Sequence, residues 1–167
     1  MYQRILVPTD GSELAAVAAN AAIAFAKACG GEIVALAVAF PDPVLLSADG
    51  VVTVGTETGI DVLLEQAQQY VGQVAETARK AGIACTALTA YGYSPADEIV
   101  EVAKRRHCDL IFIASHGRRG LSRLLAGSVT QRVLAYSPVP VMVYRPHIAY
   151  ARGRVARDLA VPTPAAG

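Results

Sequence analysis

Apolar positions along the chain alternate between two patterns. Short continuous apolar runs, each of strand length, are followed by longer segments whose apolar residues recur at helical spacing. The runs predict strands at about residues 5–7, 32–40, 84–91, 110–114 and 139–144. The spaced segments predict helices at about residues 12–28, 61–81, 94–106 and 128–136. Strands that alternate with helices in this way indicate an α/β domain with a parallel sheet.

Local residues mark the ends of these elements. Ser12 has the side chain of a helix N-cap, and Gly30-Gly31 ends the same helix. Ser94-Pro95 opens the third helix in a similar way, with proline at the first helical position. Residues 41–58 have no clear period, so we expect a long connection of the kind that often forms a lid or an interaction surface.

The apolar content of the runs places them in the sheet. Residues 110–114 form the most continuous run and belong at the centre, whereas residues 84–91 are less apolar and belong at an edge. With right-handed crossovers we expect a single open, doubly wound parallel five-stranded sheet of order 3-2-1-4-5, with helices on both faces. Ligands of such sheets bind beyond the carboxyl ends of the strands where the order reverses, here between the first and fourth strands.

Composition limits the class of protein. A chain of 167 residues with 53% hydrophobic and 17% charged residues is long enough for one domain, with a sheet buried on both faces or surface hidden in an oligomer. A net charge of +1 gives no electrostatic reason to bind nucleic acid or a membrane surface. There is no apolar run of transmembrane length and no signal-peptide layout, so we expect a cytoplasmic protein whose three cysteines are reduced.

Polar residues follow the first strand at the expected ligand crevice. They are Pro8, Thr9 and Asp10. The Asp10 carboxylate could accept hydrogen bonds from a ribose or a base, or it could end the strand by bonding local backbone. Its place at the crevice favours the first of these roles.

A second segment, residues 114–128, follows the fourth strand. Gly117 and Gly120 let the backbone approach an anion closely, and Arg118 adds positive charge nearby. Residues 128–131 match a capping box, which predicts a helix start at Ser128 whose free N–H groups and hydroxyls would face an anion. His116 fits the role of a polar loop residue that forms hydrogen bonds near a ligand.

A purely structural reading of the same residues stays open, because glycines and caps occur in every α/β protein. The glycines would then form a tight turn and Ser128 would only cap a helix. The sequence contains no Walker loop, GxGxxG fingerprint, catalytic triad, carboxylate pair or metal-binding cluster. It offers no evident general base either, which argues against an efficient ATPase.

Over residues 2–146 the chain resembles the universal stress protein family. The similarity includes the opening residues 5–12 and the closing residues 138–143. The nucleotide motif of ATP-binding members reads Gly, two residues, Gly, nine residues, Gly, and then Ser or Thr. Gly117, Gly127 and Ser128 match this motif, and Ala114 stands at its first glycine. Alanine is harmless there if its φ is negative.

The resemblance implies a Rossmann-like fold of the adenine nucleotide α hydrolase type. It also implies ATP binding, with Mg²⁺ held through the phosphates and no direct protein ligand. The implied nucleotide-binding residues surround the adenine and ribose, the ribose floor and the phosphates; they are Pro8, Thr9, Asp10, Val38, Ile113, Ala114, His116, Gly117, Arg118, Gly127, Ser128, Val129 and Thr130. A homodimer through strand Val139–Tyr144 is implied as well, and an apolar edge strand of this kind independently favours pairing.

Two functions follow as hypotheses. The first is an ATP-binding stress-response or regulatory protein that acts as a homodimer, with slow or no hydrolysis. The second is a dimeric interaction protein of the same fold that binds no nucleotide. A nucleotide-dependent ligase or hydrolase rests on analogy of fold alone. We expect the domain to occupy residues 1–146 and residues 147–167 to form a flexible tail.

Overall fold

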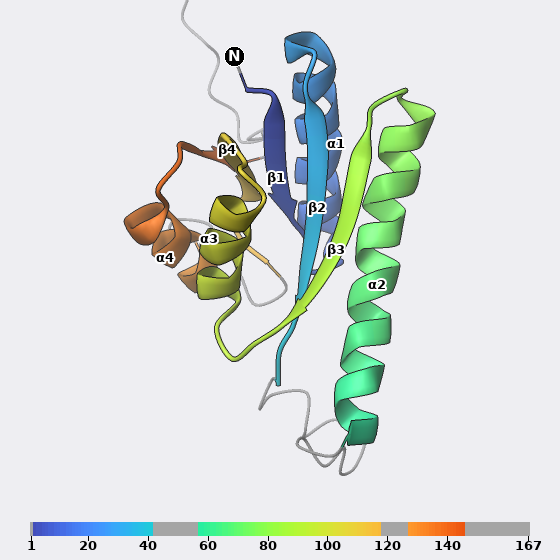
Figure 1. Ribbon diagram of the computed structural model, residues 1–167, viewed down its shortest axis with the longest axis vertical. Coiled ribbons are helices and arrows are strands. Elements are labelled where there is room, and N and C mark those ends of the chain that lie inside the picture. Colours follow the sequence, from blue (N-terminus) through green and yellow to red (C-terminus); the bar gives the residue numbers. More distant parts are fainter. Residues whose placement is uncertain (1, 42–56, 118–126, 146–167) are drawn as a thin grey trace, which may run out of the picture.

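The structure is a computed structural model that describes residues 2–41, 57–117 and 127–145 (Figure 1). Strands and helices alternate along the chain. In order they are β1 (Arg4–Pro8), α1 (Glu13–Cys29), β2 (Glu32–Ala39), α2 (Glu57–Lys80), β3 (Cys85–Tyr91), α3 (Pro95–Arg105), β4 (Leu110–Ala114), α4 (Ser128–Tyr136) and β5 (Val141–Tyr144). The five strands form one parallel sheet of order β3-β2-β1-β4-β5, which confirms the predicted fold class.

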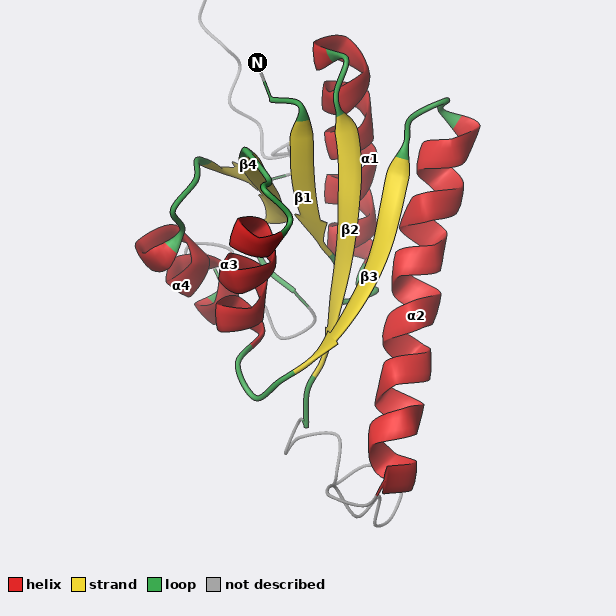
Figure 2. Cartoon of the chain, in the orientation of Figure 1, coloured by secondary structure: helices red, strands yellow, loops and turns green. Residues whose placement is uncertain are grey.

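Helices cover both faces of this sheet (Figure 2). Because successive strand residues point to opposite faces, Ile5 and Val7 of β1 pack beneath α1 and α2, whereas Leu6 packs beneath α3 and α4. The buried stripe of α1 consists mostly of alanines, which allows this helix to lie close to the strands. The sheet is therefore buried on both faces, and the ends of its strands lie outside the two helical layers.

The predicted helix caps are confirmed in α1 and α3. Ser12 accepts a hydrogen bond from the amide of Ala15, and Gly30 closes α1 in the left-handed conformation at φ 69°. Ser94 caps α3 through the amide of Asp97. Among the described residues, no helix is both long enough and apolar enough to cross a membrane.

Two element boundaries differ from the sequence prediction. Helix α2 begins at Glu57, four residues earlier than expected and inside the predicted connection 41–58, of which residues 42–56 lie outside the described part of the chain. Strand β5 begins at Val141 instead of Val139. The amide of Val139 donates to the Ser137 hydroxyl, and Pro140 has no N–H, so neither residue can donate to the ladder.

The pairing of β1 is asymmetric. All five of its residues are in register with β2, from Arg4↔Glu32 to Pro8↔Leu36. Its register with β4 covers Ile5↔Leu110 and Leu6↔Ile111, both in the amino-terminal part of the strands. The ladder thus ends before the carboxyl ends of β1 and β4, at the place where the strand order reverses.

Candidate functional site

The turn after β1 is closed by its own side chains. The amide of Thr9 continues the sheet by donating to the carbonyl of Leu36 at 2.8 Å. The Thr9 hydroxyl accepts from the amide of Gly11 at 3.2 Å, and Asp10 Oδ1 accepts from the amide of Ser12 at 3.0 Å. These bonds hold Asp10 at the carboxyl end of β1, directly before α1.

Ala114 ends β4 in ordinary strand geometry. It is buried and pairs with Tyr144 of β5, and the next amide, that of Ser115, donates to the Tyr144 carbonyl at 2.9 Å. Among the described residues, only Tyr2 and His107 are non-glycine residues with positive φ. An alanine at position 114 therefore causes no backbone strain, which is the condition under which it replaces glycine harmlessly.

Gly117 brings the loop after β4 against the turn after β1. A Cβ built on Gly117 would collide with Oδ2 of Asp10. A side chain at residue 117 would therefore require this carboxylate to move. The φ of Gly117 lies outside the positive region, so glycine is favoured here by space and not by backbone conformation. The two polar segments singled out in the sequence thus meet at the predicted crevice.

The predicted capping box of α4 is wrong. The helix begins at Ser128, so the N-cap residue is Gly127, which provides no side-chain hydrogen bond. Two bonds hold this helix start against the end of β4: Gly127 N donates to Ser115 O at 2.8 Å, and the buried Thr130 hydroxyl donates to Ala114 O at 2.9 Å. Helices α1 and α3 have serine caps, whereas no described side chain caps the first amides of α4.

The roles open to the α4 residues follow from their burial. The Thr130 hydroxyl already donates to Ala114, so what this residue offers a ligand is its N–H. Ser128 is exposed and Val129 half-buried. A Cβ on Gly127 would lie 3.5 Å from the Cα of His116, its nearest neighbour, so residue 127 tolerates a side chain sterically.

His116 has an unusual environment beside these residues. Its Nδ1 lies 3.2 Å from the Ser115 hydroxyl. Its Nε2 is buried and has no hydrogen-bond partner within the described ranges. A buried polar atom without a partner is rare in folded proteins and calls for a ligand, a water or an ion as its explanation.

The remaining predicted site residues differ in burial. Pro8 and Val38 are half-buried, and Ile113 is buried under α3 and α4. Arg118 lies outside the described residues. In the described part of the chain, no group of three or more His, Cys, Asp or Glu side chains is placed to hold a metal ion. The arrangement offers backbone N–H groups to an anion and a carboxylate to a donor.

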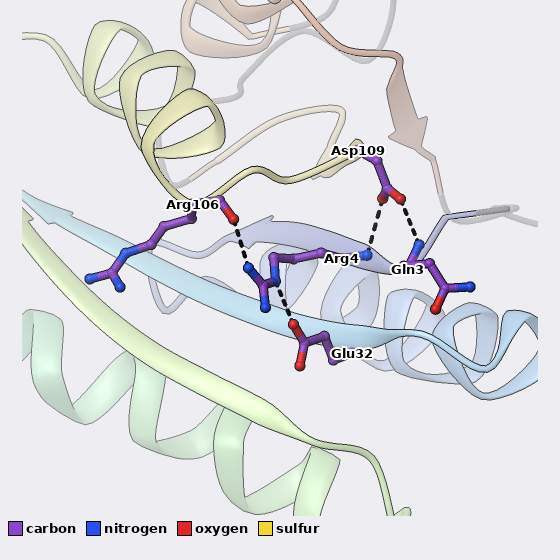
Figure 3. Close-up of polar contacts among 5 residues, drawn as sticks. All are labelled: Gln3, Arg4, Glu32, Arg106 and Asp109. Carbon is purple, nitrogen blue, oxygen red and sulfur yellow. Dashed lines mark hydrogen bonds and ion pairs between the residues drawn. The ribbon is translucent and has the colours of Figure 1, made fainter.

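The opposite edge of the sheet holds a cluster that the sequence did not reveal (Figure 3). The Arg4 guanidinium pairs with Glu32 and donates to the carbonyl of Arg106 at 3.1 Å. The Asp109 carboxylate accepts from the amides of Gln3 and Arg4 at 2.7 and 3.1 Å. We call these five residues the amino-edge clamp. It ties the starts of β1, β2 and β4 together.

A cavity of about 450 Å³ opens beside the amino-edge clamp. Its lining includes His107, which closes α3 at a positive φ of 52°. Next to it, burial raises the pKa of the Cys108 thiol to about 11, so this cysteine stays protonated and unreactive at neutral pH. All three cysteines are free thiols.

Comparison with known proteins gives consistent matches along nearly the whole described chain. The sequence model of the universal stress protein family matches residues 1–145. Universal stress protein MJ0531 of Methanocaldococcus jannaschii is 35% identical over 146 residues, which cover 87% of this chain and 83% of that protein. Universal stress protein YxiE of Bacillus subtilis is 32% identical over 87% of this chain and 100% of its own length.

Solved structures share the fold. Protein MJ0577 of Methanocaldococcus jannaschii superposes with a TM-score of 0.69 at 30% identity, over 86% of this chain and 95% of that chain. A universal stress protein in complex with cAMP has a TM-score of 0.63 at 24% identity, over 86% and 97% of the two chains. One from Archaeoglobus fulgidus in complex with dAMP has a TM-score of 0.62 at 20% identity, over 85% and 97%.

Proposed function

The chain belongs to the universal stress protein family, and from this premise we propose that it is a cytoplasmic stress-response regulator that binds an adenine nucleotide between β1 and β4. ATP is the nucleotide that its motif favours. The protein acts as a homodimer and hydrolyses ATP slowly or not at all. Proteins of the same fold crystallised with cAMP and dAMP support an adenine nucleotide as the class of ligand.

The start of α4 carries this proposal. Among the described residues its first amides have no side-chain cap, and the buried His116 Nε2 has no partner. The bond from Gly127 N to Ser115 O holds this helix start next to His116 and Gly117. An uncapped helix start presents N–H donors and the positive end of the helix dipole, which suit phosphate oxygens. In this arrangement the phosphates lie against Gly117, Gly127 and the amides of α4.

The nucleoside end of the ligand lies towards β1 and β2. Asp10 accepts hydrogen bonds from the ribose or base, and the half-buried Pro8 and Val38 contact the base. Ala114 fits the floor of the site because its strand conformation does not require glycine. Mg²⁺, when bound, would neutralise phosphate charge and would be held through the phosphates.

Strand β5 supports the homodimer. It is the last strand of the sheet, and all four of its residues, Val141–Tyr144, are half-buried. Next to it, α4 exposes Leu134 and Tyr136, which are 49% and 67% exposed. An apolar edge strand flanked by exposed apolar side chains favours pairing with a second copy.

The decisive experiment replaces Gly127 with aspartate. A side chain fits at this position, and an N-cap carboxylate accepts the α4 amides itself and repels phosphate. We expect Gly127→Asp to raise the Kd for Mg-ATP by about a hundredfold or more, measured by calorimetry on nucleotide-stripped protein. We also expect it to keep or slightly raise the melting temperature, because aspartate is a better N-cap than glycine.

The matched control is Gly127→Ala. Alanine fits against the same protein neighbours but is a poorer cap and carries no charge, so it should lower the free energy of unfolding by about 0.5 kcal/mol and weaken binding much less than aspartate does. Misfolding cannot explain a Gly127→Asp variant that binds less although it is more stable, next to a Gly127→Ala variant that binds better although it is less stable. If the wild-type protein binds neither ATP, cAMP nor dAMP at millimolar concentration, the proposed nucleotide binding is refuted, and the dimeric interaction protein becomes the leading hypothesis.

A further inference from the structure

One aromatic ring from α2 holds the turn that carries Asp10. The Tyr70 ring occupies the space that a side chain at residue 11 would need: a Cβ on Gly11 would lie 2.7 Å from Tyr70 Cζ and closer still to Cε1 and Cδ1. Gly11 also has a left-handed φ of 75°, so the turn requires glycine for two separate reasons. The sequence pattern places Tyr70 on a helix but gives no sign of this contact.

The amide of Thr9 ties the start of the turn to β2 by donating to the carbonyl of Leu36. Gly11 N and Ser12 N instead donate to the Thr9 hydroxyl and to Asp10 Oδ1, within the turn itself. The Tyr70 ring, in contrast, belongs to a helix that packs along the sheet through the buried Ala67, Val71 and Val74. Because α2 is anchored to the sheet, its ring adds a fixed contact on the side of the turn that Gly11 occupies.

We propose that Tyr70 is a positioning residue of the nucleotide site. Its ring supports Gly11 from the α2 side, and this support keeps Asp10 directed at Gly117 on the β4 side. The proposal rests on the proposed function. It also makes α2 the element through which the site is controlled, since any shift of α2 that moves the ring off Gly11 releases the turn that carries Asp10.

The binding test compares three variants of α2. Tyr70→Leu removes the flat ring, and we expect it to raise the Kd for Mg-ATP by about tenfold, the effect of a binding group that is present but misplaced. Tyr70→Phe keeps the ring carbons that touch Gly11 and should bind within about twofold of the wild type. Gln69→Ala changes the exposed neighbouring residue and should leave the Kd unchanged.

A second readout does not depend on nucleotide. The amides of Gly11 and Ser12 are the donors that close the turn, so their hydrogen exchange, measured by NMR on the nucleotide-free protein, reports directly on its order. We expect exchange at these two amides to accelerate by about tenfold or more in Tyr70→Leu and to stay at wild-type rates in Tyr70→Phe. Amides of β1 and β2 serve as internal controls for global stability.

Each outcome decides a separate claim. Unchanged exchange at Gly11 and Ser12 in Tyr70→Leu overturns the inference. Faster exchange with an unchanged Kd also overturns it, because the turn would then not need the ring for binding. If the wild-type protein binds no nucleotide, the proposed function fails instead, and the exchange rates still decide whether Tyr70 holds the turn.

Discussion

At the amino edge of the sheet, Arg4, Glu32 and Asp109 all find partners within the chain, so the starts of β1, β2 and β4 are tied together. At the carboxyl edge the register of β1 with β4 has already ended, and the Asp10 carboxylate lies against Gly117. Among the described residues there, the start of α4 has no side-chain cap and His116 Nε2 has no partner. The polar groups are thus paired at the amino ends of the strands and only partly paired at the carboxyl ends.

The cavity beside the amino-edge clamp is a weaker candidate for a ligand site than the carboxyl edge. The cavity of about 450 Å³ lies at the amino edge, where the surrounding charges already satisfy one another. A ligand there would have to replace existing hydrogen bonds and would gain little in exchange. At the carboxyl edge the proposed nucleotide would supply partners to the α4 amides and to His116 Nε2, which have no side-chain partner among the described residues.

The largest effect that should separate the two edges comes from Asp109→Ala. This change removes the acceptor of two backbone amides, and we expect it to lower the free energy of unfolding by about 2 kcal/mol and the melting temperature by about 6 °C. The Kd for Mg-ATP should stay within about twofold of the wild type, since the amino-edge clamp lies at the far end of the strands.

Glu101→Ala is the matched control for this change. Glu101 pairs with Arg105 on the exposed surface of α3 at 3.7 Å, and an exposed pair of this kind contributes within about 0.5 kcal/mol. Calorimetric unfolding and nucleotide titration of both variants check the prediction. A nucleotide affinity that falls in step with the stability of Asp109→Ala would show that the two edges are not independent.

A smaller effect, of opposite kind, is expected from Gly117→Ala. The new methyl group would displace the Asp10 carboxylate, so we expect the Kd for Mg-ATP to rise by about tenfold while the free energy of unfolding changes by less than about 1 kcal/mol. The cost is local because Asp10 is only half-buried and can turn aside.

Gly72→Ala provides the comparison for the same chemical change. Gly72 lies within α2, where a Cβ would meet nothing within 4 Å, so alanine should stabilise the helix by up to about 1 kcal/mol and leave the Kd unaltered. Isothermal titration of both variants measures the contrast. Wild-type affinity in Gly117→Ala would mean that Asp10 does not contribute to the site from its present position.

The sequence predicts the strands and their order in the sheet better than it predicts individual side-chain contacts. Continuous apolar runs identify strands such as β4, and topological rules then give the sheet order without any knowledge of contacts. The meeting of Asp10 with Gly117 follows from the same rules, because both residues come directly after strands that end at the switch point. The candidate site was therefore predictable down to its two segments.

The details that were missed depend on register or on distant contacts. Gly127 and Ser128 are adjacent and both are common N-cap residues, so the sequence cannot tell which of them is the N-cap of α4. The amino-edge clamp joins Asp109 to residues at the start of the chain, and Tyr70 reaches Gly11 from another helix. Such pairs become visible only when the fold has fixed which side chains face each other.

The smallest effect concerns Ala114, the residue at which the chain departs from the family motif. Ala114→Gly should lower the free energy of unfolding by about 0.5–1 kcal/mol, because glycine gains backbone freedom in the unfolded chain, and should change the Kd for Mg-ATP by less than about twofold. The reason is that residue 114 adopts strand geometry and its carbonyl is already held by Thr130. Ala37→Gly in β2, also buried, controls for the loss of stability. A tenfold gain in affinity that is specific to Ala114→Gly would show that its methyl group obstructs the nucleotide, and the carboxyl edge of this chain would then be open in shape but weakened as a binding site.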